Sequence, residues 1–569
     1  MDNRIANGEA LDLNKRDIIR ISRDISDKEK AIIRTRQIKV HSCLQKLGAN
    51  FPMSNVPNIA VLGSGGSLRA MIALQGVLGE LQKQGLLDAV MYLCGVSGST
   101  WCMSYIYEHE EWTEHLPVLE EKLCNKLVST AWDPKKAVDA LVESSKDNTF
   151  SLTDFWSSVV VYAMLHELDH HSLSEQRRVS IQGKVPYPIY AAVDSKKLDD
   201  DTKTRPDIWF EFTPDEAGFF HSGAFVDMRL FGSIFENGKL KTMKDEKSIS
   251  YLRGLWGSAF ADFKVIEDFI KQISGNQATD SRCQHLPCQA ASYIMQLLKH
   301  AIEEKSHEYC EKHLTGLMEL LKDQDVNNTY NLCNFLKDKY GTLEKSETVT
   351  HVLTMAETFY WEFAAGKPLF TIHEEEDERS AWDTLRILKK TISCLREWKW
   401  GTNANYLYKC GGINDKGLTG TEELQLADAG LAINSAYPLV LRPEREVKLI
   451  LSFDFSEGDP FETVKQAAIY CKKSQIPFPD IDVSELDKSK DSPSDCYIFQ
   501  GSNTPTVMHF PLFNIVNCRD KVANWRDKYS TINLSYEEQE IKDLLEVAKG
   551  NVRNNAGRIC QTMKNILPF

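Results

Sequence analysis

The sequence has no Cys-x-x-Cys pair, no apolar amino-terminal segment and no long uninterrupted apolar run. Its fourteen cysteines therefore lack zinc-ribbon spacing, and without a secretory signal we expect reduced, mostly buried thiols in a cytosolic protein. The best candidate for a membrane span, the uncharged stretch at residues 89–107, is interrupted by Gly-Val-Ser-Gly-Ser-Thr. The chain ends in Lys-Asn-Ile-Leu-Pro-Phe, which is not a prenylation box, because Cys560 lies too far inside.

Basic residues are also in deficit. Lys and Arg number 67 against 81 Asp and Glu, so the formal net charge is −14. Proteins that bind nucleic acid need basic surface to displace counterions, so we expect no nucleic-acid partner. The fractions of hydrophobic (42%) and charged (26%) residues are those of a globular protein and exclude a disordered or fibrous chain.

Residues 1–50 form a basic amino-terminal region. Between Lys15 and Lys46 there are ten Lys/Arg against four acidic residues, with isoleucines recurring at helical intervals. Such a helix could lie on anionic lipid or dock on the protein through its isoleucines, and we favour docking. The pattern leaves a membrane contact of residues 1–50 open.

The rest of the chain, residues 51–569, has the pattern of one large α/β domain. Residues 56–62 and 89–94 are short apolar runs, each leading through glycines into a helix-like stretch. This order predicts a mixed, mostly parallel central sheet flanked by helices. Residues 262–400 are polar, helix-rich and poor in glycine, and we expect them to form a cap or lid insertion in this domain.

The strongest chemical signal is Ser97, in Gly95–Thr100 between an apolar strand and a helix. A serine between glycines at such a turn is typical of a nucleophile elbow, in which the helix amino terminus favours developing negative charge. Ser99 replaces the second glycine of the usual Gly-x-Ser-x-Gly pattern, so that pattern is only partly met.

A second glycine-rich turn, Gly63–Ala70, also follows a strand and precedes a helix. It fits neither the P-loop nor the dinucleotide-binding fingerprint. Its main-chain N–H groups could instead stabilise the oxyanion that forms during acyl transfer. Arg69, in the same turn, could hold a nearby phosphate.

The nucleophile also requires a base. Asp428 ends the apolar run that begins at Leu424 and is followed by Ala-Gly, which allows close approach of another chain segment. Desolvation at a strand end could raise the pKa of this carboxyl toward useful basicity. By itself an Asp-Ala-Gly turn is also typical of ordinary surface turns.

Together these segments resemble the catalytic domain of the cytosolic (group IV) phospholipases A2, which are distant relatives of patatin. The resemblance extends from about Asn58 to Asn514 and fits a short member of the family without the calcium-binding C2 domain. It is carried by Gly63–Ala70, Gly95–Trp101, Ser151–Trp156, Trp209–Pro214, Leu252–Ser258, Asp428–Leu431, Tyr437–Pro443 and Leu451–Ser456.

The resemblance implies a dyad without histidine, with Ser97 as the nucleophile and Asp428 as its direct base. It also implies that the main-chain N–H groups of Gly66 and Ser67 form the oxyanion hole. The family usually has glycine at the position of Ser67, so this position must tolerate a side chain here.

The same resemblance implies that Arg69 binds the phosphate of a glycerophospholipid substrate and that Arg445 is a second basic residue at the site. No cofactor or metal is implied. Too few residues precede the first strand for a C2 domain, so we expect calcium-independent hydrolysis by a cytosolic protein acting peripherally on membranes. Lysophospholipase or transacylase activity is a natural extension of an acyl-enzyme mechanism.

Three alternatives compete with this interpretation. His166, Glu167 and His170 match the H-E-x-x-H pattern of zinc hydrolases. His509 follows Asp428 in the Ser…Asp…His order of α/β-hydrolase triads. A catalytically dead lipid-binding protein is the third, although such a protein would not need an intact serine, aspartate, arginine and glycine turn.

Overall fold

The computed structural model describes residues 18–129, 133–198, 201–258, 399–531 and 533–566, with four single positions at 386, 387, 390 and 394. The cap predicted at 262–400 therefore falls almost entirely outside the described residues. The chain divides into two compact units, and the fold and site described below belong to the unit made of Met1–Thr130, Met164–Ala259 and Thr402–Phe569.

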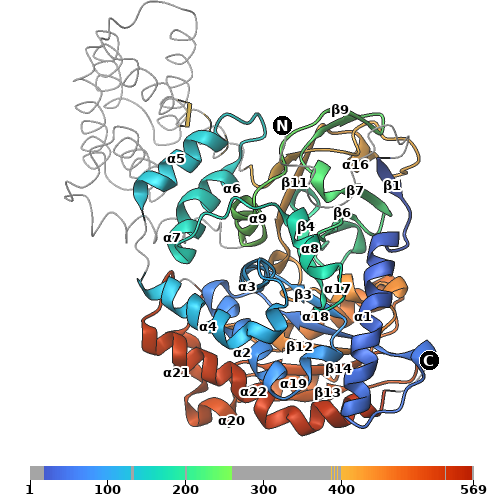
Figure 1. Cartoon of the computed structure of the whole chain (residues 1–569), viewed down its shortest axis with the longest axis vertical. Helices are drawn as coiled ribbons and strands as arrows, with labels where there is room; N and C mark the ends of the chain where they lie inside the picture. Colours follow the sequence, from blue (N-terminus) through green and yellow to red (C-terminus); the bar gives the residue numbers. More distant parts are fainter. Residues whose placement is uncertain are drawn as a thin grey trace, which may run out of the picture. The chain divides into compact units, whose positions relative to one another are not determined.

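The core of this unit is a mixed β-sheet (Figure 1). Its main path runs β1-β7-β6-β5-β4-β3-β2-β12-β14-β13, and β11 pairs with both β4 and β10. Strands β4, β3, β2, β12 and β14 pair in parallel, and antiparallel strands extend the sheet at both sides. The predicted fold class is confirmed. The strands of this sheet are β1 Ile19–Ile21, β2 Asn58–Gly63, β3 Tyr92–Gly95, β4 Tyr187–Asp194, β5 Trp209–Phe212, β6 Glu216–Phe219, β7 Ala224–Asp227, β10 Thr402–Ala404, β11 Glu423–Asp428, β12 Val447–Asp454, β13 Tyr497–Phe499 and β14 Thr506–Pro511. Strands β8 Ile234–Glu236 and β9 Lys239–Thr242 form a separate two-stranded sheet.

The parallel strands are buried on both faces, which explains why their sequences are nearly continuous apolar runs rather than alternating ones. Helix α2 is buried over most of its surface because it packs against α3 and the long carboxy-terminal α22. The helices among the described residues of this unit are α1 Asp27–Lys46, α2 Ser67–Lys83, α3 Gly98–Ile106, α4 Trp112–Ser129, α8 Arg177–Ser180, α9 Ile249–Trp256, α16 Lys416–Thr419, α17 Tyr437–Val440, α18 Glu462–Ser474, α19 Val483–Ser489, α20 Ile515–Cys518, α21 Val522–Lys528 and α22 Glu538–Lys564. The second unit, Ala131–Ala163 and Phe260–Gly401, contains α5 Pro134–Ser144 and α6 Leu152–Phe155, and α7 Tyr162–Leu165 spans the boundary between the units.

The amino-terminal region is docked on the sheet from its first described residues. Strand β1 pairs antiparallel with β7, with Ile19 opposite Val226. Helix α1 follows at once, capped by Ser26, and buries Ile32 and Leu44. Docking through apolar side chains is the arrangement that we favoured from the isoleucine pattern.

Two further features of the described residues bear on the composition. Their ten cysteines are free thiols, and eight of them are buried. None of the helices in these ranges combines the length and the apolar character that a membrane-spanning segment requires.

Candidate active site

Ser97 lies at the predicted strand-to-helix turn. Strand β3 ends at Gly95 and α3 begins at Gly98, so Ser97 caps the helix with φ 52° and ψ −126°. This strained backbone is typical of a nucleophile elbow. The Ser97 side chain is buried, and its Oγ has no hydrogen-bond partner among the described residues. The hydroxyl is therefore held in place by its backbone and is not engaged elsewhere.

The glycine-rich turn after β2 is pressed against the Ser97 turn. A Cβ on Gly98 would lie only 1.9 Å from the carbonyl oxygen of Ser67, so only glycine fits there. Gly66 has φ 147° and Ser67 has φ 55°, so Ser67 adopts the left-handed conformation that favours glycine. No main-chain carbonyl of the described residues accepts a hydrogen bond from the Gly66 amide. The start of α2 therefore presents main-chain N–H groups beside Ser97.

The strand registers bring Asp428 to the same place. Gly95, at the end of β3, pairs with Tyr190 of β4, and Asp428, at the end of β11, pairs with Ala192. Because β5 occupies the other edge of β4, β3 and β11 share one edge and end facing each other. Two residues along a strand correspond to about 7 Å. Two segments more than three hundred residues apart thus terminate next to one another.

Asp428 is fully buried and anchored through its main chain and side chain. Its amide donates to Ser258 Oγ at 3.1 Å, and its Oδ1 accepts from the Gly430 amide at 2.8 Å. A Cβ on Gly430 would lie 3.7 Å from Val96 Cγ1, so the Asp428 turn touches the residue preceding Ser97. The carboxylate is therefore fixed within the turn that lies against the Ser97 turn.

Asn434 connects the two sides of the site, and the sequence interpretation missed it. The Gly65 amide lies 3.1 Å from the Asn434 carbonyl oxygen and 3.2 Å from its Oδ1, and it donates to both. A Cβ on Gly65 would lie 2.4 Å from Asn434 Oδ1 and 2.8 Å from Ser97 Cβ. Ser258 was missed as well, although it ends one of the segments that carry the family resemblance. Nothing local in the sequence marks Asn434, because its partner is 369 residues away.

Arg69 is buried in the first turn of α2, directly after Gly66 and Ser67. Its guanidinium donates to the Phe455 carbonyl at 2.7 Å, to Thr531 Oγ1 at 2.9 Å and to the Tyr529 carbonyl. Arginine has five N–H donors, so these bonds leave some of its capacity unused. A Cβ on Gly66 would lie 2.7 Å from Arg69 Nη2, and burial lowers the pKa of Arg69. Its phosphate-binding role stays a prediction.

Arg445 is placed differently. It is fully buried, and its N–H groups make five hydrogen bonds, to the carboxylates of Glu29 and Glu211 and to the Leu439 carbonyl. Those five bonds use its whole donor capacity. The role predicted for it at the substrate also stays a prediction, but a phosphate would have to displace one of these acceptors.

Comparison with known proteins identifies the family. Residues 59–313 match the family model described as "Lysophospholipase catalytic domain". Cytosolic phospholipase A2 gamma of Mus musculus is 39% identical over 575 residues, covering 95% of this chain and 91% of the relative. The Homo sapiens protein of the same name is 38% identical over 558 residues, covering 95% of each. The chain belongs to the cytosolic phospholipase A2 family. It is accordingly a phospholipase A2, as the resemblance predicted.

Solved structures agree on the fold. Human GIVD cytosolic phospholipase A2 superposes with a TM-score of 0.66 at 21% identity, covering 97% of this chain and 69% of that one. The same human protein in complex with methyl gamma-linolenyl fluorophosphonate gives a TM-score of 0.63 at 22% identity, covering 97% and 65%. At this level of identity the comparison establishes the cytosolic phospholipase A2 fold.

The zinc alternative lacks the geometry it requires in this phospholipase A2. The pattern His166–His170 needs both histidines one turn apart on a helix, but α7 ends at Leu165 and the following residues are irregular. Glu167 forms ion pairs with Lys126 and Arg253. Among the described residues, no group of three His, Cys, Asp or Glu side chains is arranged to hold a metal ion.

The histidine of the triad alternative is engaged elsewhere. His509 lies in β14, fully buried, with Nε2 2.7 Å from the Pro460 carbonyl oxygen and its ring next to Phe461. Burial lowers the pKa of His509. No described contact joins it to the unpartnered Ser97 hydroxyl.

We therefore expect His509→Gln, which can still donate to the Pro460 carbonyl, to change kcat by less than about threefold, because a group outside the reacting centre supplies no transition-state stabilisation. Initial rates on a phospholipid substrate measure this. A loss comparable with removal of the catalytic base, about 10²-fold or more, would restore the Ser-His-Asp triad.

The carboxyl group of Glu108, just after α3, leads us to expect that the stability of the protein depends on pH. Glu108 follows α3 and lies 3.1 Å from Arg253, beside Asp169 and Glu167, and burial raises its pKa from 4.5 to about 8. Between those values the folded protein keeps a proton that the unfolded chain has lost. The free energy of unfolding therefore falls as the pH rises through this window.

We expect Glu108→Gln to flatten this dependence, because a glutamine stays neutral at every pH. Urea unfolding at pH 5.5, 7 and 8.5 measures the effect. Glu110→Gln is the matched control, since Glu110 is an exposed neighbour paired with Arg178, and it should keep the wild-type slope. An unchanged slope in Glu108→Gln would show that another group carries the dependence.

Proposed function

We propose that this phospholipase A2 hydrolyses acyl esters of glycerophospholipids with a Ser97–Asp428 dyad, through an acyl-enzyme and without calcium. Ser97 Oγ attacks the acyl carbonyl carbon while Asp428 accepts its proton. The tetrahedral intermediate collapses, and the departing alkoxide of the lysophospholipid takes that proton. Water then attacks the acyl-enzyme, gives a proton to Asp428 and releases the fatty acid, and the proton returns to Ser97.

The observation that carries this proposal is the shared edge of β4, where β3 and β11 end facing each other. Because the two strand ends lie next to each other along β4, Ser97 and Asp428 can come together without movement of a loop. The Ser97 hydroxyl without a partner and the buried Asp428 fit the roles of attacking group and proton acceptor.

The oxyanion of the intermediate would be bound by the amides of Gly66 and Ser67. These lie at the amino terminus of α2, where unpaired N–H groups and the helix dipole favour negative charge. Losing one such donor typically costs about 3–4 kcal/mol of transition-state stabilisation. Arg69, beside this turn, is the residue we propose for the phosphate group.

The proposed dyad chemistry requires no calcium at the reacting atoms, which agrees with the calcium-independent hydrolysis expected from the sequence. Serine supplies the nucleophile, aspartate accepts the proton and main-chain amides hold the oxyanion, so every step has a protein group. The acyl-enzyme can also be intercepted by a second alcohol or formed from a lysophospholipid, which gives lysophospholipase and transacylase activity. Because the substrate resides in a bilayer, we propose that the protein works in the cytosol, peripherally on membranes.

The test uses a phosphatidylcholine with different acyl chains at sn-1 and sn-2, incubated with the purified protein in EGTA or in calcium. We expect equal release of fatty acid in both buffers, and mass spectrometry of the products assigns the position cleaved. An alkyl fluorophosphonate should label a single peptide containing Ser97. Loss of hydrolysis in EGTA, or labelling of another serine, would overturn the proposal.

A further inference from the structure

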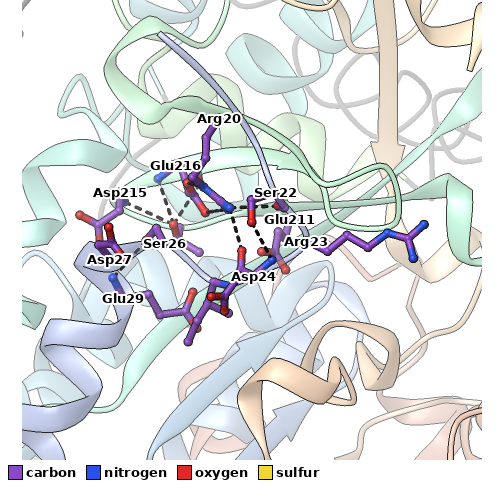
Figure 2. A network of polar contacts seen from close by, with 12 residues as sticks. Arg20, Ser22, Arg23, Asp24, Ser26, Asp27, Glu29, Glu211, Asp215 and Glu216 are labelled. Carbon is purple, nitrogen blue, oxygen red and sulfur yellow. Dashed lines mark hydrogen bonds and ion pairs between the residues drawn. The ribbon is translucent and has the colours of Figure 1, made fainter. Parts of the chain in front are cut away.

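The amino-terminal segment is tied to the catalytic sheet by charge as well as by β1. We use the name amino-terminal strap for residues 19–46, which comprise β1, a turn and α1. Arg20 donates to both carboxylate oxygens of Glu216, at 2.9 and 2.6 Å. Lys28 pairs with Asp227 at 3.1 Å. Figure 2 shows the part of this network in which strap residues between Arg20 and Glu29 lie near Glu211, Asp215 and Glu216.

One residue of the strap, Glu29, is buried in an ion-pair cluster with Arg445, Glu211 and Arg442. The Glu29 carboxylate binds Arg445 through both oxygens, at 2.9 and 3.1 Å, and Arg445 binds Glu211 of β5 at 2.8 Å. Arg442 completes the cluster by donating to Glu211 and to the Arg23 carbonyl of the strap. The two positive charges of the arginines balance the two negative charges of the glutamates, and all four side chains are buried. Removing one partner would leave a buried charge unpaired, which is costly.

This cluster anchors the end of the chain segment that follows Asp428. Residues 429–446 connect Asp428 to β12, and they contain Asn434 near their start and Arg445 at their end. Arg445 also donates to the Leu439 carbonyl of α17 at 2.7 Å. Its own carbonyl oxygen accepts from Asn58 Nδ2 at 2.8 Å. The connection is thus fixed at its far end by a side chain that Glu29 holds.

The nucleophile strand is held by the same group. Tyr92 begins β3, and its ring lies 5.6 Å from the guanidinium carbon of Arg445. Burial and the nearby Glu29 carboxylate raise the pKa of the Tyr92 hydroxyl. The main chain of Arg445 lies at the amino-terminal ends of β2 and β12, whereas Ser97 follows the carboxyl end of β3. Arg445 is thus built into the support of the site, away from the reacting atoms.

We propose that Glu29 is a positioning residue of this phospholipase A2. Its carboxylate fixes Arg445, and Arg445 fixes the far end of the 429–446 connection, which follows Asp428 directly and contains Asn434. The same arrangement makes Arg445 a positioning residue rather than a phosphate ligand, since its five N–H donors are all taken by protein acceptors. This inference rests on the proposed Ser97–Asp428 reaction.

The deciding experiment compares a phospholipid with a phosphate-free ester, such as a 4-nitrophenyl acyl ester, in Glu29→Gln and Arg445→Lys. A positioning role predicts that kcat falls by about tenfold to hundredfold on both substrates, with KM nearly unchanged, because a displaced catalytic group costs rate on any ester. A phosphate-binding role predicts a loss confined to the phospholipid and expressed largely in KM. That second pattern would overturn the proposal for Arg445.

A double variant tests the coupling itself. Glu29→Gln combined with Arg445→Lys should lose no more activity than the worse single variant, because the two residues act through one contact. Multiplied losses would show independent roles. Wild-type rates in Glu29→Gln would overturn the proposal outright.

Glu29→Asp keeps the buried charge but shortens its reach, so it serves if Glu29→Gln does not fold. It should show the same loss of kcat with an unchanged circular dichroism spectrum, and wild-type kcat would overturn the proposal. Lys28→Met is the matched control on α1, since it breaks only the ion pair with Asp227, and its kcat should stay within about twofold of the wild type. Failure of the proposed function is separately visible, because Ser97→Ala would then retain hydrolysis.

Discussion

Replacing Ser97 by alanine is expected to lower kcat for phospholipid hydrolysis by at least about four orders of magnitude, because the attacking oxygen is gone and no acyl-enzyme can form. The Ser97 hydroxyl has no hydrogen-bond partner among the described residues, so its removal should leave the thermal unfolding midpoint nearly unchanged. Labelling by a fluorophosphonate should disappear with the activity. Product formation by mass spectrometry and unfolding by circular dichroism measure the two outcomes.

The neighbouring serine provides the comparison. Ser99 Oγ donates to the Ser64 carbonyl at 2.6 Å and supports the two turns without standing at the nucleophile position. Ser99→Ala should therefore lose about tenfold in kcat, the order expected from one buried hydrogen bond. If Ser97→Ala hydrolysed phospholipid at a rate similar to Ser99→Ala, Ser97 would not be the nucleophile.

The second large effect is expected at the base. Asp428→Asn should lower kcat by about 10³- to 10⁴-fold, because the amide cannot take the serine proton. Asparagine keeps an oxygen that can accept from the Gly430 amide, so the turn should hold its shape. Fluorophosphonate labelling of Ser97 should slow by a similar factor, since activation of the serine is common to both reactions.

Asp194→Asn is the matched control for this prediction. Asp194 is also a buried carboxylate at a strand end, opposite Leu426 of the strand that delivers Asp428, and it accepts from the Lys196 amide. It should retain kcat within about threefold, since it does not face Ser97. Near wild-type labelling in Asp428→Asn would remove Asp428 from the mechanism.

The local parts of the site were predictable from sequence. Ser97 and Gly63–Ala70 are marked by glycines between an apolar run and a helical run, and steric rules act over a few residues. Asp428 needed the family resemblance, because a carboxylate at a strand end carries no local signature. The placement of Asp428 near the end of β3 depends on two strands sharing the edge of β4, which is a property of the sheet.

Other parts could not be predicted, for identifiable reasons. His166–His170 has the letters of a zinc helix, but the helix stops at Leu165, and the ion pairs of Glu167 come from residues distant in sequence. The acceptor of Arg445 on α1 lies 416 residues away, so no spacing rule reveals it. The partner of a buried charge is set by the tertiary fold and not by neighbouring residues in the sequence. The same holds for the side-chain amide of Asn434.

The Ser67 carbonyl leaves no room for a side chain at Gly98, so the turns at Ser67 and Ser97 pack closely against each other. Two turns packed in this way cannot reshape themselves around fatty acids of different length or unsaturation. We therefore expect discrimination among acyl chains to depend on residues outside both turns, and changes of substrate preference between relatives should map there.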